Sequence, residues 1–255
     1  MNKLKRFSWP GMIIILVTLV HPGWTGAEEI LKVGDFSHAA VSSDRLPENW
    51  EPLTFKNIDK HTKYEVVEED GMTVIRAGCR ASASGLIRKI HIDPRKYPVI
   101  QWRWKITGVY KRGDVTRKSG DDYPARIYIA FEYDPDRVGF LEKAKFETAR
   151  ILYGEYPPIG AINYIWGSRA PVGTRVPNPY TGRVMMIVVE SGPGKTGTWV
   201  TEERNIYRDY VDSFGQPPPM ISGVAIMTDA DNTGEATTSF YGDIVFKTDT
   251  PSDRP

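Results

Sequence analysis

The sequence has very little cysteine and histidine, and no large excess of charge of either sign. Its 255 residues contain one cysteine, Cys79, which excludes an internal disulfide framework and any metal site built from several cysteines. The histidines beyond the N-terminal segment, His38, His61 and His91, show neither a metal-site nor a triad spacing. A formal net charge of +1 gives no electrostatic basis for binding nucleic acid, so we expect no nucleic-acid partner.

Long apolar runs are also absent. Residues 12–20 form an apolar run that is too short for a membrane-spanning helix, which needs about 20 residues. Three basic residues precede this run and small residues follow it at 25–27, so residues 1–27 match a cleaved secretory signal peptide. Their loss leaves 30 basic against 32 acidic side chains. We therefore predict a periplasmic or secreted protein with no stable membrane span after cleavage, in which Cys79 is a buried, inert thiol.

From residue 28 onward, the sequence indicates a chain made mainly of β-strands. Short runs rich in β-branched and aromatic residues alternate with glycine, proline, aspartate and asparagine. Strands are predicted at 30–36, 51–56, 64–68, 72–78, 85–92, 99–107, 125–133, 161–166, 183–190, 221–228 and 236–247. Few helical patterns separate them, which favours one antiparallel, jelly-roll-like β-sandwich over 28–247, with a loose tail at 248–255.

Two short helices interrupt this pattern. The first, 139–153, has an apolar stripe formed by Phe140, Leu141, Ala144, Thr148, Ile151 and Leu152. The second, 206–214, ends at Gly215 and three prolines. We interpret both apolar stripes as core packing. Strand 183–190 is apolar on both faces, and we expect helix 139–153 to cover one of them.

Side-chain alternation divides three strands into an apolar and a polar face. The predicted core faces are Ile100, Trp102, Trp104 and Ile106; Ile127, Ile129, Phe131 and Tyr133; and Phe240, Ile244 and Phe246. The predicted polar faces are Gln101, Arg103 and Lys105; Arg126, Tyr128 and Glu132; and Thr237, Ser239, Tyr241 and Asp243. Such faces form either the solvated side of a sheet or the lining of a shared ligand groove.

Two acidic loops supply candidate cation ligands. Asp121 and Asp122 precede the strand that begins near Arg126, while Asp229 and Asp231 follow strand 221–228. Alternating oxygen ligands with a glycine suit a structural Ca²⁺ ion. However, the twelfth position of the second loop is Phe240, where a helix-loop-helix calcium site has a bidentate carboxylate. The alternative is a hairpin turn in which the Asp and Asn side chains bond to their own backbone.

Several motifs resemble an exported bacterial family called domain of unknown function 3047. They are Pro47-Glu48-Asn49-Trp50, Ser84-Gly85-Leu86, Trp102-Arg103-Trp104-Lys105, Gly120-Asp121-Asp122 with Arg126, Tyr164-Ile165-Trp166, Asp209-Tyr210 with Phe214-Gly215, the run from Thr228 to Thr233, and Tyr241-Gly242-Asp243-Ile244. The resemblance covers about 34–246 and implies little about activity. The C-terminal pattern also resembles galactose-binding-like jelly rolls, a resemblance of fold only.

Three functional hypotheses follow. The first is a module that binds a carbohydrate or a similar polar ligand of the cell envelope. Its candidate ligand-binding residues are Arg103, Arg126, Tyr128, Glu132, Trp166, Tyr241 and Asp243, bordered by the metal candidates Asp121, Asp122, Asp229 and Asp231. The second is a glycan-acting hydrolase that pairs Asp121 or Asp122 with Glu132, Asp229 or Asp243. The third is a structural envelope protein without a ligand site.

Overall fold

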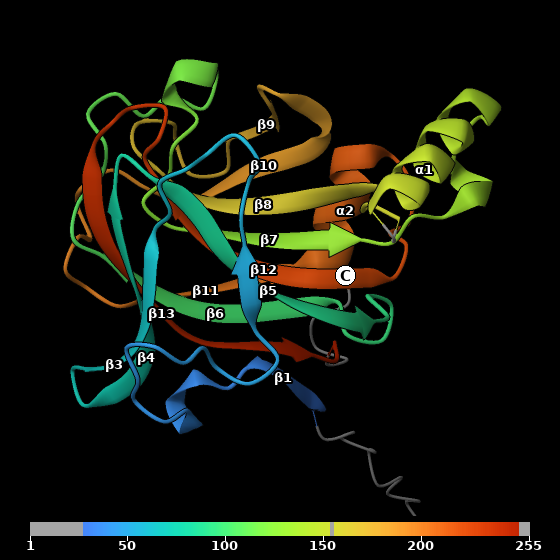
Figure 1. Ribbon diagram of the computed structural model, residues 1–255. Coiled ribbons are helices and arrows are strands. Elements are labelled where there is room, and N and C mark those ends of the chain that lie inside the picture. Colours follow the sequence, from blue (N-terminus) through green and yellow to red (C-terminus); the bar gives the residue numbers. More distant parts are fainter. Residues whose placement is uncertain (1–27, 154–155, 250–255) are drawn as a thin grey trace, which may run out of the picture.

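The computed structural model describes residues 28–153 and 156–249 (Figure 1). Its strands are β1 (Ile30–Gly34), β2 (Glu51–Leu53), β3 (Lys63–Glu69), β4 (Met72–Arg80), β5 (Ala83–Ile92), β6 (Val99–Ile106), β7 (Arg126–Phe131), β8 (Gly160–Gly167), β9 (Arg175–Asn178), β10 (Thr181–Ser191), β11 (Val200–Asn205), β12 (Ile221–Asp229) and β13 (Ala236–Lys247). Its helices are α1 (Phe140–Tyr153) and α2 (Ile206–Phe214), with short 3-10 turns η1 (Phe36–His38), η2 (Lys118–Gly120) and η3 (Pro135–Arg137). The predicted signal segment, 1–27, and residues 250–255 of the predicted tail lie outside these ranges.

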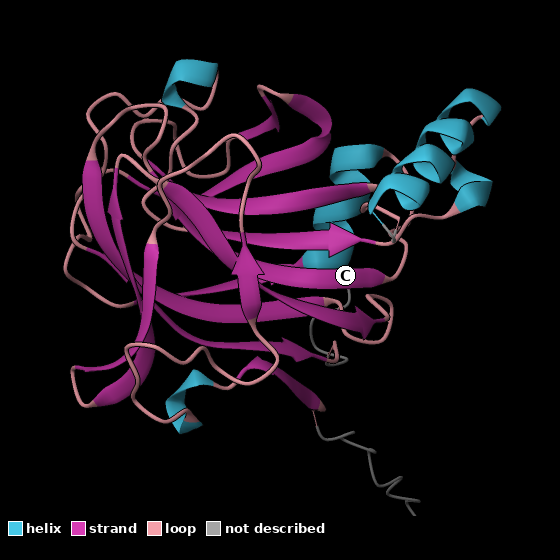
Figure 2. Cartoon of the chain, viewed as in Figure 1, coloured by secondary structure: helices cyan, strands magenta, loops and turns pink. Residues whose placement is uncertain are grey.

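The strands form two sheets, as Figure 2 shows. Sheet A has the order β11-β6-β13-β4-β3, and β1 also pairs with β13. Sheet B has the order β2-β5-β12-β7-β8-β10-β9. The predicted mainly β, jelly-roll-like sandwich is confirmed. One pair, β8 with β10, is parallel, so sheet B is mixed. Strands β9 and β11 were not predicted.

Large aromatic side chains fill the space between the sheets. Trp102 and Trp104 of β6 point inward, as their alternation predicts, and both are almost fully buried. The ring of Trp102 stacks on Tyr164 of β8 at a centroid distance of 5.2 Å. The ring of Trp104 lies 5.9 Å from Trp166 of the same strand. Contacts between β6 and β8 therefore join the two sheets at the centre of the core.

The face assignment of β13 was correct for Ile244 and Phe246, which lie in the core, but wrong for the residues before Gly242, because the strand contains a bulge. Tyr241 pairs with Trp104, but Ile244 pairs with Trp102, so three steps on β13 match two on β6. This irregularity exchanges the faces of β13 before and after Gly242. Tyr241 consequently points into the core, where its side chain is fully buried, while Phe240 lies beside Lys105 on the outer face. A Cβ atom at Gly242 would lie 2.5 Å from Nε of Arg103, so a larger residue here would require the Arg103 side chain to move.

The two helices differ in how they contact the sandwich. In α2, Ile206 and Tyr210 are buried in the main core, as predicted, and Gly215 ends the helix in the left-handed conformation at φ 71°. In α1, the predicted core stripe is wrong, because its members Phe140, Leu141 and Ile151 are exposed. The outer face of β10 is instead covered by Val115, Tyr123, Ala170 and Val176.

Cys79 lies in β4 and is buried, as predicted. Its sulfur contacts the backbone oxygen of Ser82 at 3.3 Å. Burial raises the pKa of the Cys79 thiol, which keeps it in the unreactive protonated form. Within the described ranges, no helix is long and apolar enough to cross a membrane.

Candidate functional site

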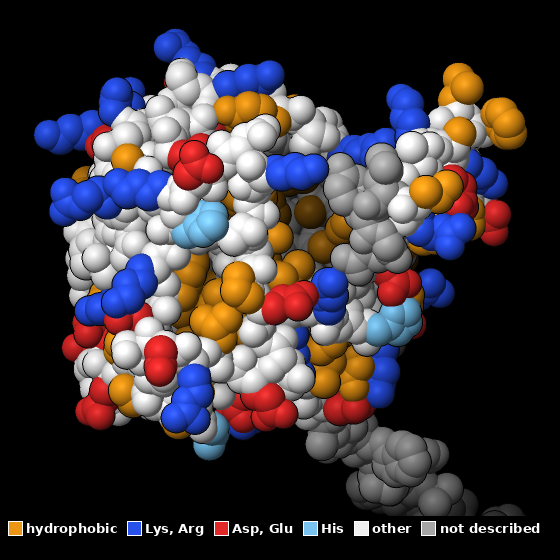
Figure 3. Space-filling model, in the orientation of Figure 1, with side chains coloured by type: hydrophobic (Ala, Val, Ile, Leu, Met, Phe, Trp, Pro, Cys, Tyr) orange, Lys and Arg blue, Asp and Glu red, His pale blue; other side chains and the backbone are white. Residues whose placement is uncertain are grey.

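The candidate site lies on the outer face of sheet B, around β7 and β8. In β7, Ile127 and Ile129 point into the core, so Arg126 and Tyr128 point to the outer face. The surface over β7 and β8 is hollowed, with hydrophobic side chains at its floor (Figure 3). A concave face with a small number of polar groups is the usual setting of a ligand site.

Arg126 occupies one end of this face. Its guanidinium carbon lies 5.0 Å from the ring centre of Tyr123 and 5.4 Å from that of Tyr128, so the group sits between two aromatic rings. One nitrogen, Nη2, donates to Asp229. The other two, Nε and Nη1, are buried and have no hydrogen-bond partner among the described residues. Arg126 therefore keeps two donor nitrogens that the described residues do not satisfy.

Asn163 is the second unsatisfied group on this face. It pairs with Tyr128 of β7 and with Met186 of β10, and its side chain is fully buried. Within the described chain, neither Oδ1 nor Nδ2 of Asn163 has a hydrogen-bond partner. A buried polar group without a partner destabilises a protein by about 1–3 kcal/mol. Such a cost at the centre of a sheet face requires an explanation.

Asn163 was missed as a candidate from the sequence. It lies in the run Ala161-Ile162-Asn163-Tyr164-Ile165-Trp166, where it is the one amide in an otherwise apolar and aromatic strand. An amide in a strand that is buried on both faces must either find partners or bind something. That pattern was the signal that could have identified it.

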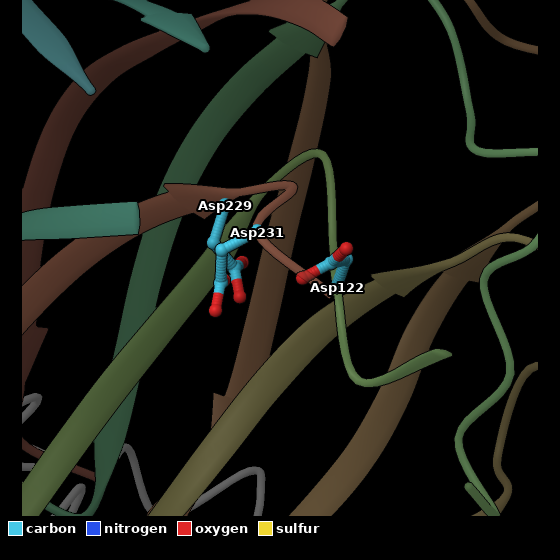
Figure 4. Close-up of side chains that lie close together, drawn as sticks. All are labelled: Asp122, Asp229 and Asp231. Carbon is cyan, nitrogen blue, oxygen red and sulfur yellow. The ribbon is translucent and has the colours of Figure 1, made fainter. Parts of the chain in front are cut away.

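The predicted acidic residues gather beside Arg126. Asp122, Asp229 and Asp231 each place one carboxylate oxygen within 4.8 Å of the others (Figure 4). Asp122 accepts hydrogen bonds from Nδ2 of Asn232 at 3.1 Å and from the backbone of Asn232 and Thr233. The two loops that the sequence places 110 residues apart are thus joined through one carboxylate.

Asp121 and Asp229 are also buried in this cluster. Asp229 accepts from the backbone nitrogen of Tyr123 at 3.3 Å and from Arg126. Asp121 accepts through Oδ2 from Asn178 at 2.9 Å, but its buried Oδ1 has no partner in the described residues. Asp121 therefore adds an unsatisfied acceptor to the unsatisfied donors of Arg126.

Burial and mutual repulsion control the ionisation of the cluster. Burial raises the pKa of Asp229 well above its ordinary value, and the neighbouring Asp122 and Asp121 raise it further. Burial likewise raises the pKa of Asp121, against the opposing effect of Arg126. Burial also raises the pKa of Tyr128, to about 12. Arg126 remains charged, because the carboxylates beside it outweigh its own desolvation.

The geometry does not favour a calcium ion in this cluster. Ca²⁺ requires six to eight oxygen ligands. Here both oxygens of Asp122 and both of Asp229 already accept protein donors, and the guanidinium of Arg126 lies among them. The structural Ca²⁺ ion stays a prediction of the sequence, without a donor set that supports it.

The other predicted ligand-binding residues do not join this site. Trp166 and Tyr241 are in the core, where the Tyr241 hydroxyl contacts Thr228 Oγ1 at 2.7 Å and Met227 O at 2.6 Å. Arg103 lies on the outer face of sheet A, 4.9 Å from the ring of Trp199. Asp243 lies on sheet A too, and accepts from Oγ of Ser37 at 2.6 Å. A single groove lined by all seven residues was a wrong prediction.

Glu132 is also separate from the Arg126 cluster. It follows the last residue of β7, whereas Arg126 begins the strand, and its carboxylate contacts Nδ1 of His91 at 2.5 Å. The hydrolase hypothesis paired Asp121 or Asp122 with Glu132, Asp229 or Asp243 across a groove. Asp243 is on the other sheet and Asp229 is held by Arg126, so the described residues bring no such pair together across an open cleft.

A pocket adjoins the cluster at Tyr123. Its volume is about 240 Å³, and it is lined by Gly113, Asp114, Val115, Thr116, Tyr123, Ser168, Arg169 and Ala170. The ring of Tyr123 contacts Arg126 on the cluster side, so one side chain contributes to both the pocket and the cluster.

Several solved structures have a similar backbone arrangement, but their sequence identity to this chain is low. One is a cellulase derived from Cel12A of Rhodothermus marinus, with a TM-score of 0.43 and 14% identity over 86% of this chain and 100% of the other. Another is the carbohydrate recognition domain of Emp47p, with a TM-score of 0.42 and 11% identity over 85% and 94%. A third is a family 30 carbohydrate-binding module of Clostridium thermocellum, with a TM-score of 0.34 and 11% identity over 87% and 98%. Similarities of this size do not extend any activity to this chain.

Sequence comparison is more decisive about the family. No curated protein sequence matches the chain. A family described as a protein of unknown function, DUF3047, matches residues 48–245. The match includes β7, β8 and the acidic loops of the candidate site, and it confirms the resemblance seen in the sequence motifs. The chain belongs to the DUF3047 family.

Proposed function

We propose that this protein binds a glycan or a similar polyhydroxylated ligand on the outer face of sheet B. The observation that supports the proposal is a set of buried polar atoms that have no partner among the described residues: Nε and Nη1 of Arg126, both amide atoms of Asn163, and Oδ1 of Asp121. These groups flank Tyr128, whose half-buried ring lies on the same face. Directional polar groups beside an aromatic ring suit the polar and apolar surfaces of a sugar.

The chemistry of the unsatisfied groups favours a neutral ligand. Arg126 offers donors, Asp121 an acceptor, and Asn163 one of each kind. Sugar hydroxyls donate and accept, so they match this mixed set. A phosphate would match Arg126, but its oxygens mainly accept hydrogen bonds and would leave the buried amide oxygen of Asn163 without a donor. A protein exported to the periplasm or beyond, as residues 1–27 predict, would meet such ligands in the cell envelope.

Glycan-array binding of the full chain tests the proposal. We expect wild type to bind a defined set of glycans, and Tyr128→Ala to weaken that binding about ten-fold by removing the ring contact. Trp199→Ala is the matched control, because Trp199 is a partly exposed aromatic that packs against Arg103 on the outer face of sheet A. EDTA and added Ca²⁺ serve as further arms, which we expect to leave binding unchanged.

Two results would contradict the proposal. The absence of glycan binding under all conditions would favour a structural envelope role. Loss of binding in Trp199→Ala with full binding in Tyr128→Ala would show that the ligand binds on sheet A instead of sheet B. A requirement for Ca²⁺ would leave glycan binding as the function, but it would support the predicted cation site at the Asp122 cluster.

A further inference from the structure

Helix α1 presents an apolar stripe to solvent, away from the sandwich. The exposed fractions of its large apolar side chains are 85% for Phe140, 79% for Leu141 and 78% for Ile151. At 100° per residue these three lie on one side of the helix, together with the exposed Ala144 and Thr148. Figure 1 shows α1 standing out from the sheets, and Figure 3 shows hydrophobic side chains at its outer end.

The opposite side of α1 fixes this orientation. Phe146 is 1% exposed and stacks on Tyr133 at a centroid distance of 4.0 Å. Arg183 of β10 lies 4.8 Å from the ring of Phe146 and contacts Glu142 at 2.5 Å. The helix is therefore attached by its polar and aromatic side, with the apolar stripe facing outward.

The size of the stripe argues against a protein partner. A helix of 14 residues is about 21 Å long, so one face of it offers a few hundred Å². A stable interface buries about 800 Å² on each partner. An amphipathic helix that lies in a bilayer interface needs no matching protein surface, since its apolar side chains enter the acyl boundary directly. A projecting helix also reaches a flat surface more easily than a recessed one.

The charges around the stripe favour an anionic surface. Both acidic residues of α1 have basic partners, since Glu142 pairs with Arg183 and Glu147 with Arg150. Lys143 and Lys145 have no ion-pair partner in the part of the chain that the structure describes. Two free cations beside an apolar stripe match the headgroups of anionic lipids.

We propose that α1 is a peripheral membrane contact, which inserts Phe140, Leu141 and Ile151 into the headgroup and acyl boundary of an anionic bilayer while the sandwich stays in water. The contact is independent of the glycan site on sheet B. It would hold a glycan-binding domain beside the membrane without a spanning segment.

A position-specific fluorescent probe tests the contact. Thr148→Cys places an environment-sensitive label within the stripe of α1, and Val41→Cys, at a loop residue that is 62% exposed, is the matched control. Cys79 is buried and is not expected to react. The labelled full chains are mixed with vesicles of phosphatidylcholine alone or with added phosphatidylglycerol. Because the label reports its own surroundings, binding through residues 12–20 would not change its emission.

We expect the label at 148 to shift to shorter wavelength with anionic vesicles, and the label at 41 to stay unchanged. Replacing Phe140, Leu141 and Ile151 by Ser should abolish the shift. Replacing Lys143 and Lys145 by Gln should weaken partitioning about five-fold for each lysine. An unchanged label at 148 would overturn the proposal. A shift without vesicles that grows with protein concentration would overturn it in favour of a second copy of the chain.

Discussion

The two outer faces of the sandwich each bury a cation, but they satisfy it differently. On sheet A, the Lys105 ammonium contacts Glu69 at 2.5 Å and Asp70 at 2.7 Å, and lies 4.9 Å from the ring of Phe240. On sheet B, Arg126 donates to the carboxylate of Asp229, and its two other nitrogens are buried without a partner in the described ranges. Both cations sit among aromatic rings, so the difference lies in the completeness of their hydrogen bonding.

The completeness of hydrogen bonding distinguishes a polar cluster that stabilises the fold from one that can bind a ligand. A polar cluster whose members all have partners stabilises the fold and has no capacity left for a ligand. A cluster with unmatched donors and acceptors loses stability that only a ligand or bound water can restore. Arg126, Asn163 and Asp121 belong to the second kind, which is why we place the site on sheet B.

The largest expected effect comes from removing the two cations in turn. Arg126→Met leaves the buried carboxylate of Asp229 without its partner, and we expect a loss of about 3–5 kcal/mol in the free energy of unfolding. Lys105→Met should lose only about 1 kcal/mol, because the exposed Asp70 and the part-exposed Glu69 can turn to water. Urea denaturation at pH 7 measures both.

The double variant Arg126→Met, Asp229→Asn is the control for this prediction. It removes both charges together and should recover at least half of the loss, including where the single variant does not fold. Equal losses of unfolding free energy in Arg126→Met and Lys105→Met would contradict the proposed difference between the two faces.

The sequence supports the architecture better than the site. Alternation in β6 and β7 correctly placed Trp102, Trp104, Ile127 and Ile129 in the core, because both strands are regular there. In β13 the same logic placed Ile244 and Phe246 correctly but failed for the residues before Gly242, since a bulge there exchanges the faces of the strand. No local pattern marks a bulge that depends on pairing with another strand.

Helix α1 shows a second feature that the sequence alone does not determine. Its apolar stripe was identified correctly, yet an amphipathic pattern does not say what the stripe faces. The buried ring of Phe146 determines the orientation through its contact with Tyr133. Similarly, the sequence identified both acidic loops and Arg126, but only the pairing of β7 with β12 and β8 joins them and adds Asn163.

The difference between satisfied and unsatisfied buried groups also applies to two carboxylates, with a smaller expected effect on stability. Glu65 is paired with Arg76, while Oε1 of Glu202 is buried without a partner among the described residues. Burial, with the nearby Glu190, raises the pKa of Glu202 from 4.5 to about 7. The folded protein therefore retains a proton that the unfolded chain releases, and this contribution to stability is lost as pH rises from about 4.5 through 7.

Glu202→Gln should thus raise the free energy of unfolding at pH 8 by about 1–3 kcal/mol and have little effect at pH 4. Thermal unfolding at both pH values measures the change. Glu203→Gln is the matched control, since Glu203 is 53% exposed and paired with Lys247, and it should cost no more than about 1 kcal/mol. A loss of stability in Glu202→Gln at pH 8 would show that this carboxylate is satisfied.

The most direct test compares two buried polar side chains: Asn163, which has no hydrogen-bond partner in the described part of the chain, and Thr228, which has two. Thr228 Oγ1 donates to Pro124 O at 2.9 Å and contacts the Tyr241 hydroxyl at 2.7 Å. We expect Thr228→Val to lose about 1–2 kcal/mol in the free energy of unfolding. Asn163→Val should gain up to about 1 kcal/mol without ligand and lose binding to the glycans identified on the array. A loss of stability in Asn163→Val with glycan binding intact would contradict the account, because the amide would then serve the fold rather than a ligand.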